Sequence, residues 1–339
     1  MEQDPETGQW NTSGIMDIAD RKRYLENHPV KEREYLLPTP MMRRAYTAIR
    51  DRVWSRGTGI VFYATPRCGK TRCAMAVKEM ISEEFPKAYV SLLSARRSSR
   101  GAGGHMYKLI LSAEHHAMAA RTNEDLLFDS VLTDIRLGVK LKGGNQYVLF
   151  IDELQLLSER DLEQLFCLHN ALNLHKIRMT TVSFAQPEIL HTRSALMASN
   201  DRQIIARFLA EMRHFDTCNN AEELAEVLRA YDEHSEFPER SGWTYTRFFL
   251  PLAFSAGFRL TSYALLIWEI LQEVGGAGEI IPIEHICMSI ENLLMMSWSK
   301  DCSNFVLDRK EIEAAVESTQ LRSFNAALSE AEPNESGIN

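Results

Sequence analysis

Several features that would assign this sequence to a class at once are missing from it. The 339 residues include only six cysteines, with no C-x-x-C pair and no histidine at zinc-finger spacing, so neither a disulfide framework nor a zinc site is indicated. The longest apolar stretch, residues 248–271, is interrupted by arginine, glycine and proline, and the N-terminus lacks the charged-then-apolar order of a signal peptide. We therefore expect a cytoplasmic protein.

An excess of basic residues is also missing. The net charge of −8 argues against a uniformly basic surface for nucleic acid, although it averages over uneven regions. With 45% hydrophobic and 25% charged residues, the composition is that of an ordinary globular protein long enough for two compact units. The sequence has no internal repeat, nucleophile elbow or metalloprotease motif.

The pattern of apolar residues divides the chain into four regions. Residues 1–35 are polar and mixed in charge, and we expect an N-terminal arm that binds a partner or stays flexible. Residues 36–218 alternate strand and helix patterns, which predicts a parallel α/β sheet. Residues 219–321 carry apolar stripes at helical spacing and predict a small helical domain, and residues 322–339 predict a flexible tail. The expected strands of the sheet cover residues 60–63, 88–93, 147–151 and 179–185.

A phosphate-binding loop follows the first expected strand. Residues 64–71 read Ala-Thr-Pro-Arg-Cys-Gly-Lys-Thr and match G-x-x-x-x-G-K-[ST] except at the first position, where alanine replaces glycine. In this pattern Lys70 reaches the β and γ phosphates and Thr71 holds Mg²⁺. A chance match in a surface turn is the alternative, but the preceding strand and following helix favour the loop. The expected nucleotide contacts are Ala64, Thr65, Pro66, Arg67, Cys68, Gly69, Lys70, Thr71 and Arg72.

Two carboxylates follow the third expected strand. The run Tyr147-Val-Leu-Phe-Ile ends in Asp152-Glu153, and such acids at the end of a buried strand are costly unless they serve a cation. Asp152 suits Mg²⁺, and Glu153 suits polarising the water that attacks the γ phosphate. Alone, this pattern is often only a strand that leads into a helix cap. Together with the phosphate loop it indicates an ATP site.

These motifs resemble those of the TnsC/TniB branch of the AAA+ ATPases, which regulate DNA transposition. The resemblance extends to Gln155, in a D-E-x-Q pattern, and to the Gln-Pro-Glu-Ile-Leu run at 186–190, and it covers about residues 36–275. ATPases of secretion and of replication initiation share parts of it. The resemblance implies an AAA+ P-loop NTPase fold, a three-layer α/β domain with strand order 5-1-4-3-2 followed by a helical lid. It also implies ATP hydrolysis with ATP and Mg²⁺ as cofactors.

The resemblance assigns further candidate roles around the nucleotide. Gln186, or alternatively Ser183, would sense the γ phosphate at the end of the fourth strand, although a polar residue at a strand end needs no such role. The segment at 202–208 resembles the helix end that presents an arginine finger to the neighbouring subunit. Arg207 is preferred as the finger, Arg202 and Arg213 remain open, and an ordinary surface ion pair is the alternative.

Arg259 is the candidate sensor arginine of the lid. It precedes an apolar helix in the segment Ala-Gly-Phe-Arg-Leu at 256–260, and the resemblance implies that its side chain reaches the bound phosphates. A salt-bridged or snorkelling arginine is the alternative. If the finger and sensor arginines both act in this way, the nucleotide lies between subunits and a homo-oligomer is part of the active site.

A local basic segment provides the candidate contact to DNA. Between Phe85 and Ala113 there is no acidic residue, and the Ser- and Gly-rich loop after the second expected strand suits phosphates better than bases. A solvated charge run is the alternative. In the resembling family, ATP-bound subunits form rings or filaments around duplex DNA. The expected DNA contacts are Arg96, Arg97, Arg100 and Lys108.

Three hypotheses for function follow. The first is an ATP-dependent regulator of DNA transposition that oligomerises on duplex DNA, recruits a transposase and a TniQ-like target-selection protein, and disassembles after hydrolysis. The second is an AAA+ ATPase of the secretion or loader type that remodels protein complexes without binding DNA. The third is a scaffold that binds nucleotide without turnover.

Overall fold

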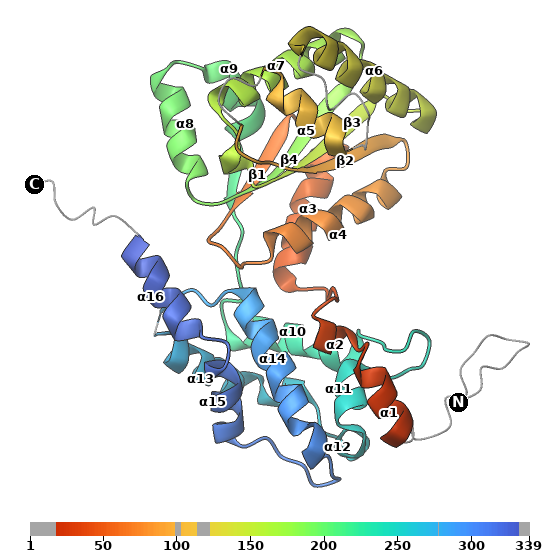
Figure 1. The fold of residues 1–339 in the computed structure, drawn as a ribbon, viewed down its shortest axis with the longest axis vertical. Coiled ribbons are helices and arrows are strands. Elements are labelled where there is room, and N and C mark those ends of the chain that lie inside the picture. The colour runs from red at the N-terminus through yellow and green to blue at the C-terminus, as the bar shows by residue number, and fades with distance from the viewer. Residues whose placement is uncertain (1–17, 99–102, 114–122, 277, 332–339) are drawn as a thin grey trace, which may run out of the picture. The chain divides into compact units, whose positions relative to one another are not determined.

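Two compact units make up the protein in the computed structural model, which describes residues 18–98, 103–113, 123–276 and 278–331. One unit comprises residues 42–216, and the other combines residues 1–41 with 217–339 (Figure 1). No helix within the described ranges is both long and apolar enough to cross a membrane.

The unit of residues 42–216 is built on five parallel strands in the order β2-β3-β4-β1-β5. This is the predicted order 5-1-4-3-2 counted from the other edge, and the predicted fold class is confirmed. Strand β3 lies between β2 and β4 and is buried along its whole length. The strands are β1 (Gly59–Tyr63), β2 (Ala88–Ser94), β3 (Gln146–Asp152), β4 (Arg178–Ala185) and β5 (Met212–His214).

Helices cover both faces of the sheet and give the unit three layers (Figure 1). On one face lie α3 (Pro40–Trp54) and α4 (Lys70–Glu84), and on the other lie α5 (His105–Ala113), α6 (Glu124–Lys142) and α7 (Glu159–Leu174). The layering follows from the strand pattern, since alternate residues point to opposite faces. The alternate residues Tyr147, Leu149 and Ile151 of β3 belong to one buried cluster with apolar residues of α5, α6 and α7.

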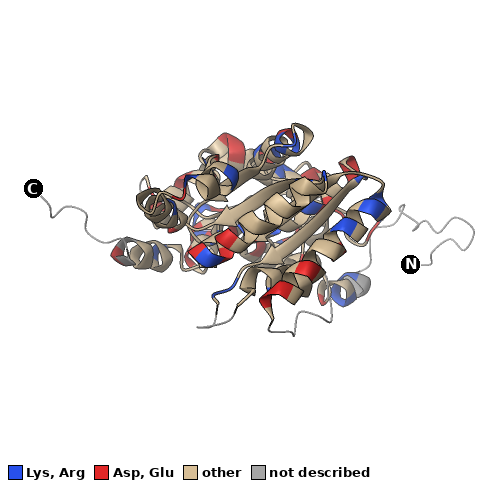
Figure 2. Ribbon diagram, turned by 90° about the horizontal axis from the view of Figure 1, so that it is seen from above, with Lys and Arg blue, Asp and Glu red and all other residues tan. Residues whose placement is uncertain are grey.

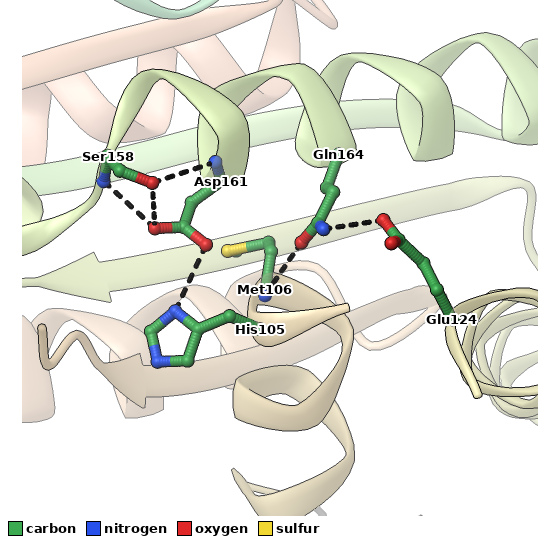
Figure 3. A network of polar contacts seen from close by, with 6 residues as sticks. All are labelled: His105, Met106, Glu124, Ser158, Asp161 and Gln164. Carbon is green, nitrogen blue, oxygen red and sulfur yellow. Dashed lines mark hydrogen bonds and ion pairs between the residues drawn. The ribbon is translucent and has the colours of Figure 1, made fainter. Parts of the chain in front are cut away.

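The first turns of α5, α6 and α7 are joined by a polar network (Figure 3). Ser158 and Asp161 form a capping box at the start of α7, and Asp161 also pairs with His105 Nδ1 at 3.0 Å. Gln164 accepts a hydrogen bond from the main-chain N–H of Met106 at 3.0 Å and donates to Glu124 at 2.7 Å. Capping groups satisfy main-chain donors that a helix itself leaves free, so this network caps the starts of α5 and α7 and links them to Glu124 at the start of α6.

The last part of the α/β unit returns the chain to the sheet edge. After β4 come α8 (Ile189–Ala198), the short α9 (Arg202–Ile204) and a π-helical turn, η3 (Ile205–Leu209). A side chain at Gly59 of β1 would meet the main-chain oxygen of Arg207 at 2.6 Å, so η3 packs directly on the start of β1. Glycine is needed at this position because the two backbones approach so closely.

The other unit is helical. Its core includes residues of α10, α13, α14 and α15, among them Leu228, Ile270, Ile290 and Val316, all almost completely buried. Its helices after residue 217 are α10 (Ala221–Glu233), α11 (Tyr245–Phe249), α12 (Pro251–Ser255), η4 (Leu260–Tyr263), α13 (Ala264–Gly275), α14 (Ile283–Ser297), η5 (Trp298–Lys300), α15 (Arg309–Glu317) and α16 (Leu321–Ala331).

Part of the segment expected to be an N-terminal arm belongs to this helical unit. It contains α1 (Ile18–Leu25) and α2 (Pro29–Glu32), and Arg21 donates to the main-chain oxygen of Phe249 at 3.2 Å. His28 is completely buried, and its ring packs against the aromatic ring of Phe248 at a centroid distance of 4.3 Å. Tyr35 Oη donates to the buried carboxylate of Glu291 at 2.6 Å. These contacts could not be expected from the sequence because the segment lacks apolar periodicity.

The C-terminal end differs from expectation in a similar way. Helix α16 covers residues 321–331, most of which were expected to be a flexible tail. Leu321 is fully buried, and Asn325 donates to the main-chain oxygen of Gly275 at 2.8 Å. Residues 1–17 and 332–339 lie outside the described part of the chain.

Candidate functional site

The predicted phosphate loop connects β1 to α4, as the motif requires. Gly69 has a φ of 83° immediately before the helix, a conformation that favours glycine. Ala64 is not among the residues of positive φ, so its Cβ is tolerated where the motif has glycine, and the residue is buried. Within the loop, Thr65 Oγ1 and Cys68 Sγ lie 3.3 Å apart. Because the loop leads directly into α4, the main-chain N–H groups at the start of this helix can bind an anion.

Lys70 lies at the centre of this loop. Its ammonium donates to the main-chain oxygens of Ala64 and Thr65, both at 2.8 Å, and the side chain is buried. Burial lowers the pKa of Lys70, while neighbouring acidic groups including Glu153 and Asp152 oppose that shift. The loop thus holds one compact positive charge where phosphate oxygens would lie.

The remaining loop candidates are less enclosed. Arg67 has a positive φ of 65° and an exposed side chain, and Pro66 accepts a long contact from Cys68 Sγ at 3.7 Å through its main-chain oxygen. Arg72 is exposed on the first turn of α4. The structure therefore places the predicted residues along the loop and the first turn of α4, and of them only Ala64, Cys68 and Lys70 are buried.

Thr71 and Asp152 meet although they are far apart in the sequence. Thr71 Oγ1 donates to Asp152 Oδ2 at 2.7 Å, and Asp152 Oδ1 is buried with no hydrogen-bond partner in the described part of the chain. Burial raises the pKa of Asp152, partly offset by the bond from Thr71. An unpaired buried carboxylate oxygen beside a hydroxyl is the donor set that Mg²⁺ uses together with phosphate oxygens and water. Among the described residues, no group of three or more His, Cys, Asp or Glu could hold a metal ion.

Glu153 lies one residue beyond β3 in a strained conformation. Its φ of 58° and ψ of 40° place a non-glycine residue in the left-handed region, where strain often accompanies function. Its Oε2 accepts hydrogen bonds from Gln155 Nε2 at 2.6 Å and from Gln186 Nε2 at 3.1 Å. The structure thus brings the predicted water-activating residue and the preferred sensor candidate into contact.

The alternative sensor, Ser183, lies elsewhere. It is buried within β4, in register with Ile151 of β3 and Val61 of β1, and not at the strand end where Gln186 lies. Gln155 is the residue whose importance the sequence did not reveal. It appeared there only as a motif letter, and its position depends on the 3₁₀ turn η2 (Leu154–Leu156), which directs its side chain back to Glu153.

The preferred finger candidate, Arg207, is engaged within its own unit. Its guanidinium lies over the ring of Phe166 at 4.3 Å and donates to Asn170 Oδ1 at 3.2 Å. Arg213 pairs with Glu211 at 2.7 Å. Arg202 is exposed and has no side-chain partner among the described residues. Of the three candidates, Arg202 is therefore the least constrained.

Arg259 is held by its own helical unit. Its guanidinium donates to the main-chain oxygens of Phe254 at 2.9 Å and Phe258 at 2.6 Å and lies 3.6 Å from the ring centroid of Phe254. The turn that follows it is fixed by the buried Asp232, which accepts a bond from the N–H of Thr261 at 3.0 Å. The predicted sensor role requires Arg259 to exchange these contacts for a phosphate.

The predicted DNA contacts are only partly described. Arg96 and Arg97 are exposed just after β2, Lys108 is half-buried on α5, and Arg100 lies outside the described residues. In Figure 2, both Lys and Arg positions and Asp and Glu positions occur on the helices of the described chain.

Comparisons with known proteins place the fold. No protein-family model matches the sequence, and the comparison with curated proteins found no match. Among solved structures, the Aeropyrum pernix ORC2 protein in its ADPNP–ADP complexes has a TM-score of 0.56 at 15% identity, covering 90% of this chain and 74% of that one. Its ADP form gives 0.51 at 16% identity over 84% and 70%. Drosophila ORC bound to DNA gives 0.50 at 11% identity over 98% and 73%. The protein thus shares the fold of these ORC structures.

Proposed function

We propose that this protein is a Mg²⁺-dependent ATPase that regulates DNA transposition. The observation that carries the ATPase part is the contact between Thr71 and Asp152, because it joins the phosphate loop to the acidic strand end at 2.7 Å. Two motifs that occurred by chance in surface turns would not be expected to form such a contact. The ADPNP–ADP complexes of the similar Aeropyrum pernix structure support nucleotide binding by the same fold.

The chemistry is hydrolysis of ATP to ADP and phosphate. Lys70 would bind the β and γ phosphates, and Thr71 and Asp152 would hold a Mg²⁺ ion that neutralises phosphate charge. Glu153 accepts a hydrogen bond from the attacking water and orients it, with Gln186 beside it at the end of β4. The water oxygen bonds to the γ phosphorus as the bond from that phosphorus to the bridging oxygen breaks, so that ADP leaves with the electron pair and the water proton passes to the released phosphate. In this proposal Arg207 or Arg202 of a neighbouring subunit and Arg259 of the lid stabilise the developing charge.

The transposition part rests on the resemblance of motifs to the TnsC/TniB branch. In this proposal ATP-bound subunits form a ring or filament on duplex DNA in the cytoplasm, using Arg96, Arg97, Arg100 and Lys108 against the backbone. The assembly recruits a transposase and a TniQ-like target-selection protein and dissociates after hydrolysis. The DNA-bound Drosophila structure of similar fold is consistent with an AAA+ unit acting on DNA.

The decisive test is duplex binding measured by fluorescence anisotropy with a slowly hydrolysed ATP analogue. We expect ATP-dependent, sequence-independent binding that weakens steeply with salt. Combining Arg96→Glu, Arg97→Glu and Arg100→Glu should reduce the negative slope of log affinity against log salt by about 3. The control combines Lys140→Glu and Lys142→Glu at the end of α6, which are exposed and outside the proposed contact. Failure of the wild type to bind DNA at low salt would leave the protein-remodelling ATPase as the better explanation.

A further inference from the structure

Gln155 uses both ends of its side-chain amide. Its Nε2 donates to Glu153 Oε2 at 2.6 Å, and its Oε1 accepts from the main-chain N–H of Gln186 at 2.9 Å. The first contact lies just beyond β3 and the second just beyond β4. One side chain therefore links the candidate water-activating carboxylate to the backbone at the end of the neighbouring strand.

The orientation of this amide is fixed by chemistry. Exchanging its oxygen and nitrogen would set the oxygen against the carboxylate of Glu153 and the NH₂ group against the N–H of Gln186, so both contacts would become repulsive. Glu153 can only accept while ionised, and a main-chain N–H can only donate. The arrangement has one consistent assignment, and it makes Gln155 a donor to Glu153.

Two amides converge on the same oxygen of Glu153. Gln155 and Gln186 both donate to Oε2, and Oε1 accepts no hydrogen bond from the described part of the chain. A carboxylate held by one oxygen cannot rotate freely about its last bond, so the other oxygen keeps one direction. Oε1 is therefore the atom left to receive a hydrogen bond from water.

We propose that Gln155 is a positioning residue that orients Glu153 and couples it to the position of Gln186 at the end of β4. The proposal rests on the ATPase function proposed above. When Gln186 moves toward a bound γ phosphate, its main-chain N–H moves with it, and Gln155 transmits that displacement to Glu153. Gln155 itself touches no reacting atom, and its effect falls on kcat and not on nucleotide affinity.

A purely structural role for Gln155 predicts different behaviour. If the amide only stabilised the turn η2, Gln155→Met would lower stability without lowering kcat, and the pH profile of Gln155→Glu would run parallel to that of wild type. Gln155→Met keeps similar volume and flexibility but removes both hydrogen bonds. Gln155→Glu keeps the shape but adds a negative charge that repels Glu153 until the pair binds one proton, after which a carboxyl O–H donates to Glu153 as the amide did.

The experiment measures kcat, nucleotide affinity and the pH profile of both variants beside wild type. We expect Gln155→Met to lower kcat by about 10- to 100-fold with unchanged affinity and an unchanged profile. Gln155→Glu should be more impaired at alkaline pH, and its kcat relative to wild type should rise as the pH falls. Unchanged nucleotide affinity reports that each variant is folded.

The possible results distinguish failure of the positioning role of Gln155 from failure of the proposed ATPase function. Wild type without turnover removes the proposed ATPase and the inference with it. Wild-type turnover with equal kcat in Gln155→Met overturns the positioning role alone. A pH profile of Gln155→Glu that runs parallel to that of wild type overturns the positioning role as well.

Discussion

The candidate ATP-site residues near the carboxyl ends of the strands contact one another, whereas two candidate arginines, Arg207 and Arg259, contact residues outside that site. Thr71 reaches Asp152, and Gln186 reaches Glu153, across the ends of different elements. Arg207 instead lies over Phe166, and Arg259 lies over Phe254. The strand-end set, Thr71, Asp152, Glu153 and Gln186, is therefore connected within one chain. Arg207 and Arg259 are instead held by contacts within their own units.

The strand-end set and the two arginines differ in what they require before they can act on a nucleotide. The strand-end set requires only the fold, because parallel strands bring their carboxyl ends to one edge of the sheet. The arginines must give up cation–π contacts and hydrogen bonds before they can bind phosphate, and those contacts are worth about 0.5–2 kcal/mol each. A neighbouring subunit or a bound nucleotide has to supply that energy. We therefore expect Arg207 to matter only in an assembled state and Arg259 only when nucleotide is bound.

Lys70→Ala should produce the largest effect and would test the connected set directly. Removing the buried ammonium takes away the positive charge of the loop, so ATP affinity should fall about 100-fold or more. Isothermal titration calorimetry with ATP and Mg²⁺ measures this. Lys78→Ala, two turns further along α4, is the control and should bind as wild type does. Equal affinity in both variants would contradict the assignment of the loop.

Replacing the finger candidates would test whether these arginines act only between subunits. Arg202→Ala and Arg207→Ala should leave ATP affinity of the isolated subunit unchanged. The variant that removes the finger should lower kcat at least about 10-fold at concentrations where subunits assemble. Arg213→Ala, the third candidate, is measured beside them, and Arg178→Ala, an exposed arginine that donates to Asn173 Oδ1 at 3.0 Å, is the control. If none of the three candidate variants loses more turnover on assembly than Arg178→Ala does, the finger is not in this segment.

A smaller effect is expected from His28, which reports on the helical unit alone. Burial lowers its pKa to about 3, so the folded protein keeps the ring neutral while the unfolded chain binds a proton near its ordinary value of 6.5. Stability contributed by this residue is thus complete above pH 6.5 and is lost as the pH falls from there toward 3. His28→Phe should flatten the decline of the melting temperature in that range. A wild-type melting temperature that is constant from pH 7 to about pH 5 would contradict the burial of neutral His28.

The parts of this structure that sequence could predict are those that local spacing encodes. The phosphate loop and the acidic strand end each fix their own backbone, so Lys70, Thr71, Asp152 and Glu153 could be named in advance. The strand order came from the resemblance. Contacts between polar residues that are distant in the sequence could not be predicted from it. Gln155 depends on a single 3₁₀ turn, and the anchoring of Tyr35 on Glu291 depends on a helix more than two hundred residues away.

The candidate arginines also show that sequence does not predict contacts between distant residues. Sequence placed Arg207 and Arg259 at motif positions, but the rings and carbonyls that hold them are supplied by the fold. The order of motifs indicates which residues have a role. Only their contacts show whether a side chain is already in position to perform that role within one subunit.

Whether the connected strand-end set hydrolyses ATP can be decided with Glu153→Gln. Steady-state phosphate release should be measured for wild type and variant at saturating ATP and Mg²⁺, with nucleotide affinity determined in parallel. We predict wild-type turnover, a variant at least about 100-fold slower, and affinities that agree within about 3-fold. Equal turnover in the two proteins, or negligible turnover in both, would contradict hydrolysis by this set.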